Sequence, residues 1–218
     1  MFKSLWRLIN VFPFCKLSKL QHIIPILHRS VRGVLLFLAL TGLSPPAAFS
    51  TAPADYAREI RELAEAGDAE AQFALAQLLD LSSQSAQNRE EAITWLQKAA
   101  DQDLAAACFT LGLKYEFGAT LRQDLQQAAA WYRRAALQDL PMAQYRLGLL
   151  HLPDDGPPEP LPAFAWLSLA AEHGYPEAAE ARDRAAGLLT PENRIRAKEM
   201  REDLRQQIHG ILQGLAER

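Results

Sequence analysis

The residue types that carry out catalysis are sparse in this chain and follow no known catalytic pattern. Beyond residue 50 the sequence contains three histidines and four serines: His151, His173, His209, Ser82, Ser83, Ser85 and Ser168. Many hydrolases place a nucleophile or a metal-bound base in a motif such as G-x-S-x-G, S-x-x-K or H-E-x-x-H, and none of these motifs occurs here. The sequence therefore predicts a protein that is not an enzyme and has no catalytic residues.

Acidic side chains and cysteines are the remaining groups that could do chemistry. Four acids are the candidates for a catalytic acid pair, and that role would require them to converge in one pocket: Asp80, Glu116, Asp154 and Asp155. Their convergence would favour the alternative of an envelope enzyme, or a binder, that acts on peptidoglycan or a related polymer. Cys108 is the one cysteine beyond residue 50, so we expect no disulfide within that part, no cysteine-based metal site and no cofactor. We expect Cys108 to be buried and inert.

Charge divides the 218-residue chain into two parts. The residues before Asp55 include six cations and no acid, whereas the rest carries 17 Lys and Arg against 26 Asp and Glu, a net charge of −9. Hydrophobic residues make up 49% of the sequence, which is enough for a packed core. Because an acidic surface repels phosphates, the composition argues against nucleic acid as a partner.

The first fifty residues have the order of a secretory signal. An uncharged apolar segment at 34–43 follows two arginines and precedes small residues. Ten residues rise only about 15 Å as a helix, about half of the hydrocarbon thickness of a bilayer. We predict that residues 1–50 are a signal peptide and that the protein is exported, to the periplasm or out of the cell. The alternative is that this N-terminal segment stays uncleaved as an inner-membrane anchor, the protein's one contact with a membrane.

The sequence after the leader is built from a repeat. Residue types recur at spacings of 36 and then 35 or 36 in four columns: Trp95, Trp131, Trp166; Ala71, Ala107, Ala143; Leu75, Leu111, Leu147; and the aromatic column Phe73, Phe109, Tyr145. One residue is missing between Leu147 and Trp166, in a proline-rich segment. Because loops tolerate deletions better than helices do, this predicts a loop at 152–162.

Each unit is expected to form two helices that bury their apolar faces against neighbouring units. Ala107 and Leu111 lie on one stripe of a first helix, where Gly112 allows a neighbouring helix to approach closely. We expect Asn88 and Asp124 to be the N-caps of second helices.

Two further apolar stripes are expected. In the second unit a large ring alternates with alanines on the second helix: Ala128, Trp131, Tyr132, Ala135 and Ala136. A terminal helix begins at Thr190-Pro191 and is expected to have one apolar side: Ile195, Met200, Leu204, Ile208, Ile211 and Leu215. We expect this helix to cover the open end of the array.

The pattern A-x-x-x-L-G-x-x-Y, then a glycine-containing loop and D-x-x-x-A-x-x-W-x-x-x-A-A, resembles the Sel-one-like repeat, a relative of the tetratricopeptide repeat (TPR). The second unit carries the full motif: Ala107, Leu111, Gly112, Tyr115, Gly118, Asp124, Ala128, Trp131, Ala135 and Ala136. The resemblance implies an all-α fold, an α-solenoid of helix-turn-helix Sel-one-like/TPR-like repeats with a C-terminal capping helix. Its expected parts are a leading half-repeat at 55–68, repeats at 69–104 (degenerate), 105–140 and 141–175, and a C-terminal cap at 176–218.

Such a solenoid implies a non-catalytic scaffold of the bacterial cell envelope that binds a protein or peptide on its concave face. The candidate groove residues lie on the first helices, away from the core stripe: Phe73, Gln77, Phe109, Leu113, Glu116, Tyr145 and Leu149. A row of aromatic and leucine side chains with an acidic edge suits an amphipathic or basic peptide. The alternative is that the rings of the aromatic column are buried between successive first helices.

Overall fold

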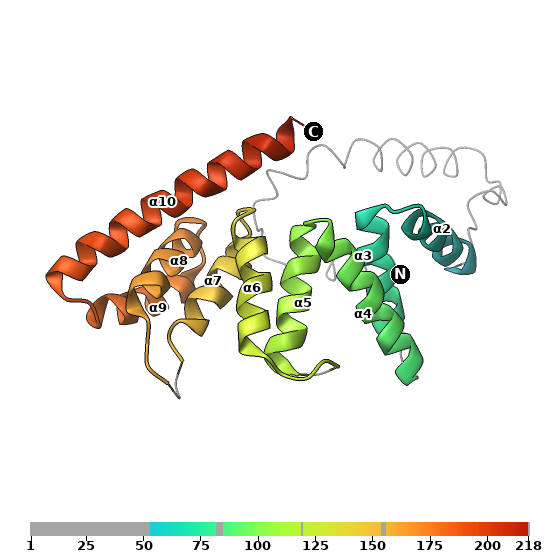
Figure 1. Ribbon diagram of the computed structural model, residues 1–218, viewed down its shortest axis with the longest axis horizontal. Coiled ribbons are helices and arrows are strands. Elements are labelled where there is room, and N and C mark those ends of the chain that lie inside the picture. Colours follow the sequence, from blue (N-terminus) through green and yellow to red (C-terminus); the bar gives the residue numbers. More distant parts are fainter. Residues whose placement is uncertain (1–52, 82–84, 119, 154–155, 218) are drawn as a thin grey trace, which may run out of the picture. The chain divides into compact units, whose positions relative to one another are not determined.

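The computed structural model describes residues 53–81, 85–118, 120–153 and 156–217, so the predicted signal peptide lies outside the described residues. Figure 1 shows the described part as a succession of helices. In chain order they are α2 (Pro53–Glu65), α3 (Ala69–Leu81), α4 (Ala86–Asp101), α5 (Ala105–Phe117), α6 (Leu125–Ala136), α7 (Pro141–Leu150), α8 (Pro160–Glu172), α9 (Pro176–Gly187) and α10 (Pro191–Ala216). The described residues contain no strand, and no helix among them is both long and apolar enough to cross a membrane.

The helices pack in chain order as a stack of hairpins, which confirms the predicted all-α solenoid. The hairpins are α3/α4, α5/α6 and α7/α8, and each contacts the next through α4/α5 or α6/α7 (Figure 1). Helix α2 packs on α3, and α9 packs on α8. The segment at 151–159 joins α7 to α8, so a loop lies where it was predicted, although α8 begins at Pro160 and residues 160–162 of the predicted loop are helical.

Two of the three second helices, α4 and α6, begin at side-chain caps, whereas α8 has no side-chain bond at its N-cap. Asp124 Oδ1 accepts hydrogen bonds from the backbone N–H groups of Gln126 and Gln127, both at 3.0 Å, so this predicted N-cap is confirmed. The prediction for Asn88 is wrong, because α4 begins three residues earlier. Ser85 is the N-cap there, and its hydroxyl accepts the backbone N–H of Asn88 at 3.2 Å.

Small residues on the first helices admit large side chains from the second helices. A Cβ built on Gly112 would lie 2.6 Å from the ring of Tyr132, and one on Gly148 would lie 2.6 Å from Leu167. The close approach predicted for Gly112 is therefore confirmed. The ring that fills this space is fully buried Tyr132, whereas Trp131 on the same stripe is only half-buried beneath the guanidinium of Arg134.

The turns between repeats share one backbone conformation. Four residues spaced 36, 36 and 35 apart all have positive φ, between 61° and 100°: Gly67, Asp103, Asp139 and Gly174. A side chain from each later turn reaches back to the one before. Gln102 donates to the Gly67 carbonyl at 3.0 Å, and Gln138 donates to the Asp103 carbonyl at 2.7 Å. These bonds tie the turns into a row along one edge of the stack.

A second repeated contact satisfies one carbonyl near the end of each of the helices α2, α4 and α6. Three buried residues at equivalent positions donate to the carbonyl eight residues earlier: Gln72 to Ala64 at 3.1 Å, Cys108 to Ala100 at 3.5 Å and Gln144 to Ala136 at 3.3 Å. Cys108 is fully buried, as predicted, and burial raises the pKa of its thiol to about 11. The thiol therefore fills a position where the other repeats use an amide donor.

Two helices close the C-terminal end of the stack. Ala178, Ala181 and Ala185 of α9 form a small core with α8. Helix α10 begins where it was predicted to begin, after the N-cap Thr190, whose hydroxyl accepts the backbone N–H of Asn193. The helix packs along α8.

Only two residues of the predicted apolar stripe of α10, Leu204 and Ile208, are buried, together with Ala197. Met200, Ile211 and Leu215 are 37–43% exposed, and Ile195 is 62% exposed. Thirteen residues separate Ile195 from Ile208, and at about 100° per residue they lie on opposite sides of the helix.

Candidate protein-binding face

The aromatic column predicted on the first helices is half-buried. Phe109 packs against Tyr132 with ring centroids 5.6 Å apart, and Tyr145 packs against Tyr175 with centroids 5.1 Å apart. Phe73 also lies against the core. These rings contribute to packing between helices and leave only part of their surface accessible to a partner.

The other predicted groove residues lie in separate places. Gln77 is exposed and lines a shallow hollow of about 20 Å³ between α3, α4 and α5. Glu116 and Leu149 line a hollow of about 490 Å³ between the second and third repeats. Leu113 is half-buried on α5 and lines neither hollow. The structure therefore brings two of the predicted residues together at one sizeable site.

This site, the repeat 2/3 hollow, is bounded by the end of α5, the start of α6 and the end of α7. Its lining is mainly apolar: Phe117, Leu125, Ala129, Leu149, Leu150 and Pro153. Phe117 is 61% exposed and Leu125 is 49% exposed. Large apolar side chains that converge on a concave surface and remain exposed are typical of interaction sites.

Phe117 and Leu125 were not among the predicted groove residues, although the repeat contains a signal for Phe117. It ends the first helix of its unit, and the equivalent positions of the other units are Leu81, Pro153 and Leu188. Leu81 and Leu188 are also exposed. An apolar residue that recurs at the repeat spacing outside the core stripe indicates a surface column. No comparable repetition marks Leu125.

Charged groups at the rim of the repeat 2/3 hollow are paired. The hydroxyl of Tyr132 donates to Glu116, and Arg146 Nη1 lies 3.3 Å from Glu116 Oε1. Burial, and then the bond to Glu116, raises the pKa of Tyr132 well above its usual value, so the hydroxyl remains a donor. The Arg146 guanidinium also lies 5.4 Å from the centroid of the Phe117 ring. The rim thus holds a fixed ion pair beside apolar surface.

The described acids do not converge into a catalytic pair. Asp80 forms an ion pair with Lys114 at 2.9 Å and lines the shallow hollow, whereas Glu116 lines the repeat 2/3 hollow. Asp154 and Asp155 lie outside the described residues. The residues that the structure describes contain no group of His, Cys, Asp and Glu that could hold a metal ion.

The histidines are engaged at helix ends and on the helix surface. His151 follows the last residue of α7, and its Nδ1 lies 2.7 Å from Glu159 Oε2 across the connecting loop. His173 is the C-cap of α8 and pairs with Asp139 at 2.8 Å. His209 lies 2.8 Å from the amide nitrogen of Gln213 one turn later on α10.

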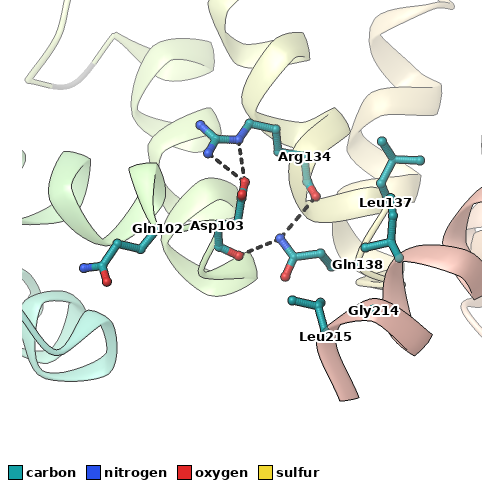
Figure 2. A pocket seen from close by; sticks show the side chains of 8 residues that line it. Gln102, Asp103, Arg134, Leu137, Gln138, Gly214 and Leu215 are labelled. Carbon is teal, nitrogen blue, oxygen red and sulfur yellow. Dashed lines mark hydrogen bonds and ion pairs between the residues drawn. The ribbon is translucent and has the colours of Figure 1, made fainter. Parts of the chain in front are cut away.

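A second hollow, of about 340 Å³, lies at the end of α10 beside the row of turns (Figure 2). Figure 2 shows Leu137 and Leu215 there together with a polar group in which Arg134 bonds Asp103. We call this site the α10-end hollow.

The fold and these surfaces define an α-solenoid of helix-hairpin repeats without an evident catalytic site in the described residues. The Sel1 repeat family model matches residues 69–104, 105–140 and 141–175. The crystal structure of a Sel1 repeat protein from Oxalobacter formigenes is 32% identical with a TM-score of 0.52, and the match covers 58% of this chain and 96% of that one. The chain belongs to the Sel1 repeat family, whose repeats are commonly protein–protein interaction modules.

A larger relative shares the same fold. The crystal structure of c5321, described as a protective antigen present in uropathogenic Escherichia coli strains and displaying an SLR fold, is 25% identical with a TM-score of 0.64. The match covers 84% of this chain and 39% of that protein, so this chain corresponds to less than half of it. No functionally curated protein matches the chain.

Proposed function

We propose that this protein is a non-catalytic scaffold of the bacterial cell envelope that binds another protein, and that the partner is a peptide segment held on the face of the first helices. The observation that carries this proposal is the repeat 2/3 hollow. Phe117 and Leu125 remain exposed there, and two of the predicted groove residues, Glu116 and Leu149, belong to its lining.

The chemistry of this hollow suits one or two apolar anchor side chains of an amphipathic peptide. Binding energy at protein interfaces is concentrated in a few apolar anchors that leave water completely. Glu116 already pairs with Arg146, so the rim presents no unpaired buried charge that would penalise an apolar guest. The net charge of −9 from Asp55 onward favours a partner segment with cations beside its anchors.

Capture of partners from the envelope fraction of the native host tests this proposal. Leu125→Glu places a charge in the hollow, and its position at the start of α6 favours an acid there. We expect this variant to lose the partner that the unaltered protein captures. Leu188→Glu is the matched control, because Leu188 is similarly exposed at the end of α9. Equal capture by both variants would reject the repeat 2/3 hollow, and recovery of a glycan polymer would favour the alternative of a peptidoglycan binder.

Export is a separate part of the proposal and rests on the basic, acid-free leader and its apolar segment. We expect protein isolated from the host envelope to begin near Thr51. Intact-mass measurement decides between the two forms of the protein, because a mass that retains residues 1–50 would identify an inner-membrane anchor.

A further inference from the structure

The packing of α10 on α8 shows how an amphipathic helix docks on the second-helix side of this stack. The apolar residues Leu204 and Ile208 are buried in one core with Trp166, which is only 2% exposed. Beside them, Arg201 and Arg205 both form ion pairs with Glu172, the last residue of α8. The helix is therefore held by an apolar stripe and by cations on an acid at the end of a second helix.

The first repeat has an acid at the equivalent position. Glu172 corresponds to Leu137 in the second repeat and to Asp101 in the first, at spacings of 35 and 36 residues. Asp101 is the last residue of α4 and is exposed. The turn that follows it supplies Gln102 and Asp103 to the α10-end hollow (Figure 2).

Helix α10 reaches this hollow without filling it. Its apolar stripe continues beyond Ile208 as Ile211, Leu212 and Leu215, which are 37–43% exposed. The charge pattern changes at the same place, because 191–205 contains nine charged residues and 206–216 contains none. The uncharged end of α10 therefore forms one apolar wall of the α10-end hollow with the partly exposed side chains of Ile211 and Leu215. Leu137 adds a further apolar side chain to the lining of this hollow.

The opposite wall is polar, with Asp103 bonded to Arg134, and it lies on the edge formed by the turns between repeats. The three turn segments 65–68, 101–103 and 137–139 contain five acids and no lysine or arginine. The last turns of α4 and α6 carry Lys98, Arg133 and Arg134, of which Arg134 is bonded to Asp103, and Asp139 is paired with His173. Even with these three cations counted, acids outnumber lysine and arginine by five to three along this edge. Charge complementarity therefore favours a cationic partner.

We propose that the α10-end hollow binds a basic amphipathic helix of another protein, in the manner in which α10 binds the third repeat. Its apolar side packs against Leu137, Ile211 and Leu215, and its cations pair with Asp101 and Asp103. A second copy of this chain fits less well, because it would bring the same acidic edge and an uncharged helix end. This site is distinct from the repeat 2/3 hollow, which is lined by other residues.

Fluorescence anisotropy with a labelled helical peptide of leucine and lysine in amphipathic order tests the proposal on the full chain. We expect the peptide to bind, and a leucine–glutamate peptide of the same order not to bind. Leu215→Glu and Asp101→Lys should each weaken binding by about tenfold or more, as expected when one good contact is lost. Leu188→Glu should bind the peptide like the unaltered protein, and circular dichroism melting verifies that each variant is folded.

Three outcomes would overturn the proposal. Equal binding by Leu215→Glu and the unaltered protein would show that the hollow is not the site. Loss of binding in Leu125→Glu alone would place the peptide in the repeat 2/3 hollow, which would support the proposed function and reject this inference. A dimer in sedimentation analysis that Leu215→Glu abolishes would identify a second copy as the occupant.

Discussion

The ring of Tyr132 lies so close to Gly112 that a Cβ on the glycine would come within 2.6 Å of two ring carbons. Both residues belong to the second repeat, one on α5 and one on α6, and their contact sets how closely the two helices pack. The ring is fully buried, and neither helix can move away without opening a cavity.

Gly112→Ala should therefore destabilise the protein although alanine favours helices. We expect a loss of about 1–3 kcal/mol in the free energy of unfolding, because the added methyl group forces the ring or the helix to move. Gly210→Ala on α10 is the control, since nothing lies within 4 Å of a Cβ there. It should stabilise the protein by about 0.5–1 kcal/mol, the ordinary helix preference for alanine. Urea denaturation measures both, and a stabilising Gly112→Ala would contradict the close packing.

Phe109 and Phe117 separate the packing role of an aromatic ring from a binding role. Phe109 is half-buried against Tyr132, so Phe109→Ala should cost about 2 kcal/mol, roughly half of the ~3–5 kcal/mol of a fully buried ring. Phe117 is 61% exposed, and Phe117→Ala should change stability by about 0.5 kcal/mol or less while it weakens partner capture. Thermal melting combined with capture checks both. A large loss of stability in Phe117→Ala would assign that ring to the core.

The docking of α10 predicts a contrast between two residues of the same helix. Leu204 is buried against the core, so Leu204→Ala should cost about 2–5 kcal/mol. Ile195→Ala should change stability by about 0.5 kcal/mol or less, because Ile195 faces solvent. Similar melting temperatures for the two variants would show that α10 does not pack on α8 in solution.

Cys108 should be unreactive in the folded protein and should make stability depend on alkaline pH. Burial raises the pKa of its thiol to about 11 from 9.0, so the folded state holds this proton more tightly than the unfolded state does. Its contribution is complete below pH 9 and decreases as the pH rises from 9 towards 11. A thiol reagent at pH 8, applied to a Cys15→Ser background, should label Cys108 only after unfolding. Rapid labelling of the native protein would contradict its burial.

The same pH dependence can be isolated with Cys108→Ala. This variant removes the thiol, so the difference in stability between it and the parent protein should shrink between pH 9 and 11. Urea denaturation at several pH values measures that difference. A constant difference across this range would show that the thiol titrates alike in both states.

The fold was predictable because its determinants repeat. The columns of Trp, Ala and Leu occur three times, and the missing residue before Trp166 located the loop between α7 and α8. Local choices were less predictable. Ser85 and Asn88 are both good capping residues three positions apart, and only the tertiary structure selects Ser85. The contacts between α10 and α8 determine which side of α10 faces the core. Ile195 lies on the other side and is therefore exposed, which the sequence of α10 alone does not show.

The candidate binding face was predictable only in part. Helical periodicity placed Phe109 and Tyr145 on the first helices, but their ring partners lie elsewhere in the chain: Tyr132 on α6 and Tyr175 at the N-cap of α9. The hollow between repeats depends on where α5, α6 and α7 end relative to one another, and helix ends are poorly determined by local sequence. Leu125 enters the site through this arrangement and not through a repeated position.

Site-specific photo-crosslinking in the native host tests most directly whether the repeat 2/3 hollow binds a protein. A photoreactive phenylalanine analogue at position 125 lies in the hollow, and the same analogue at position 94 lies on the exposed side of α4. We expect a discrete protein adduct from position 125 that Phe117→Ala reduces, and no such adduct from position 94. The same adducts from both positions, or none from position 125, would contradict this expectation.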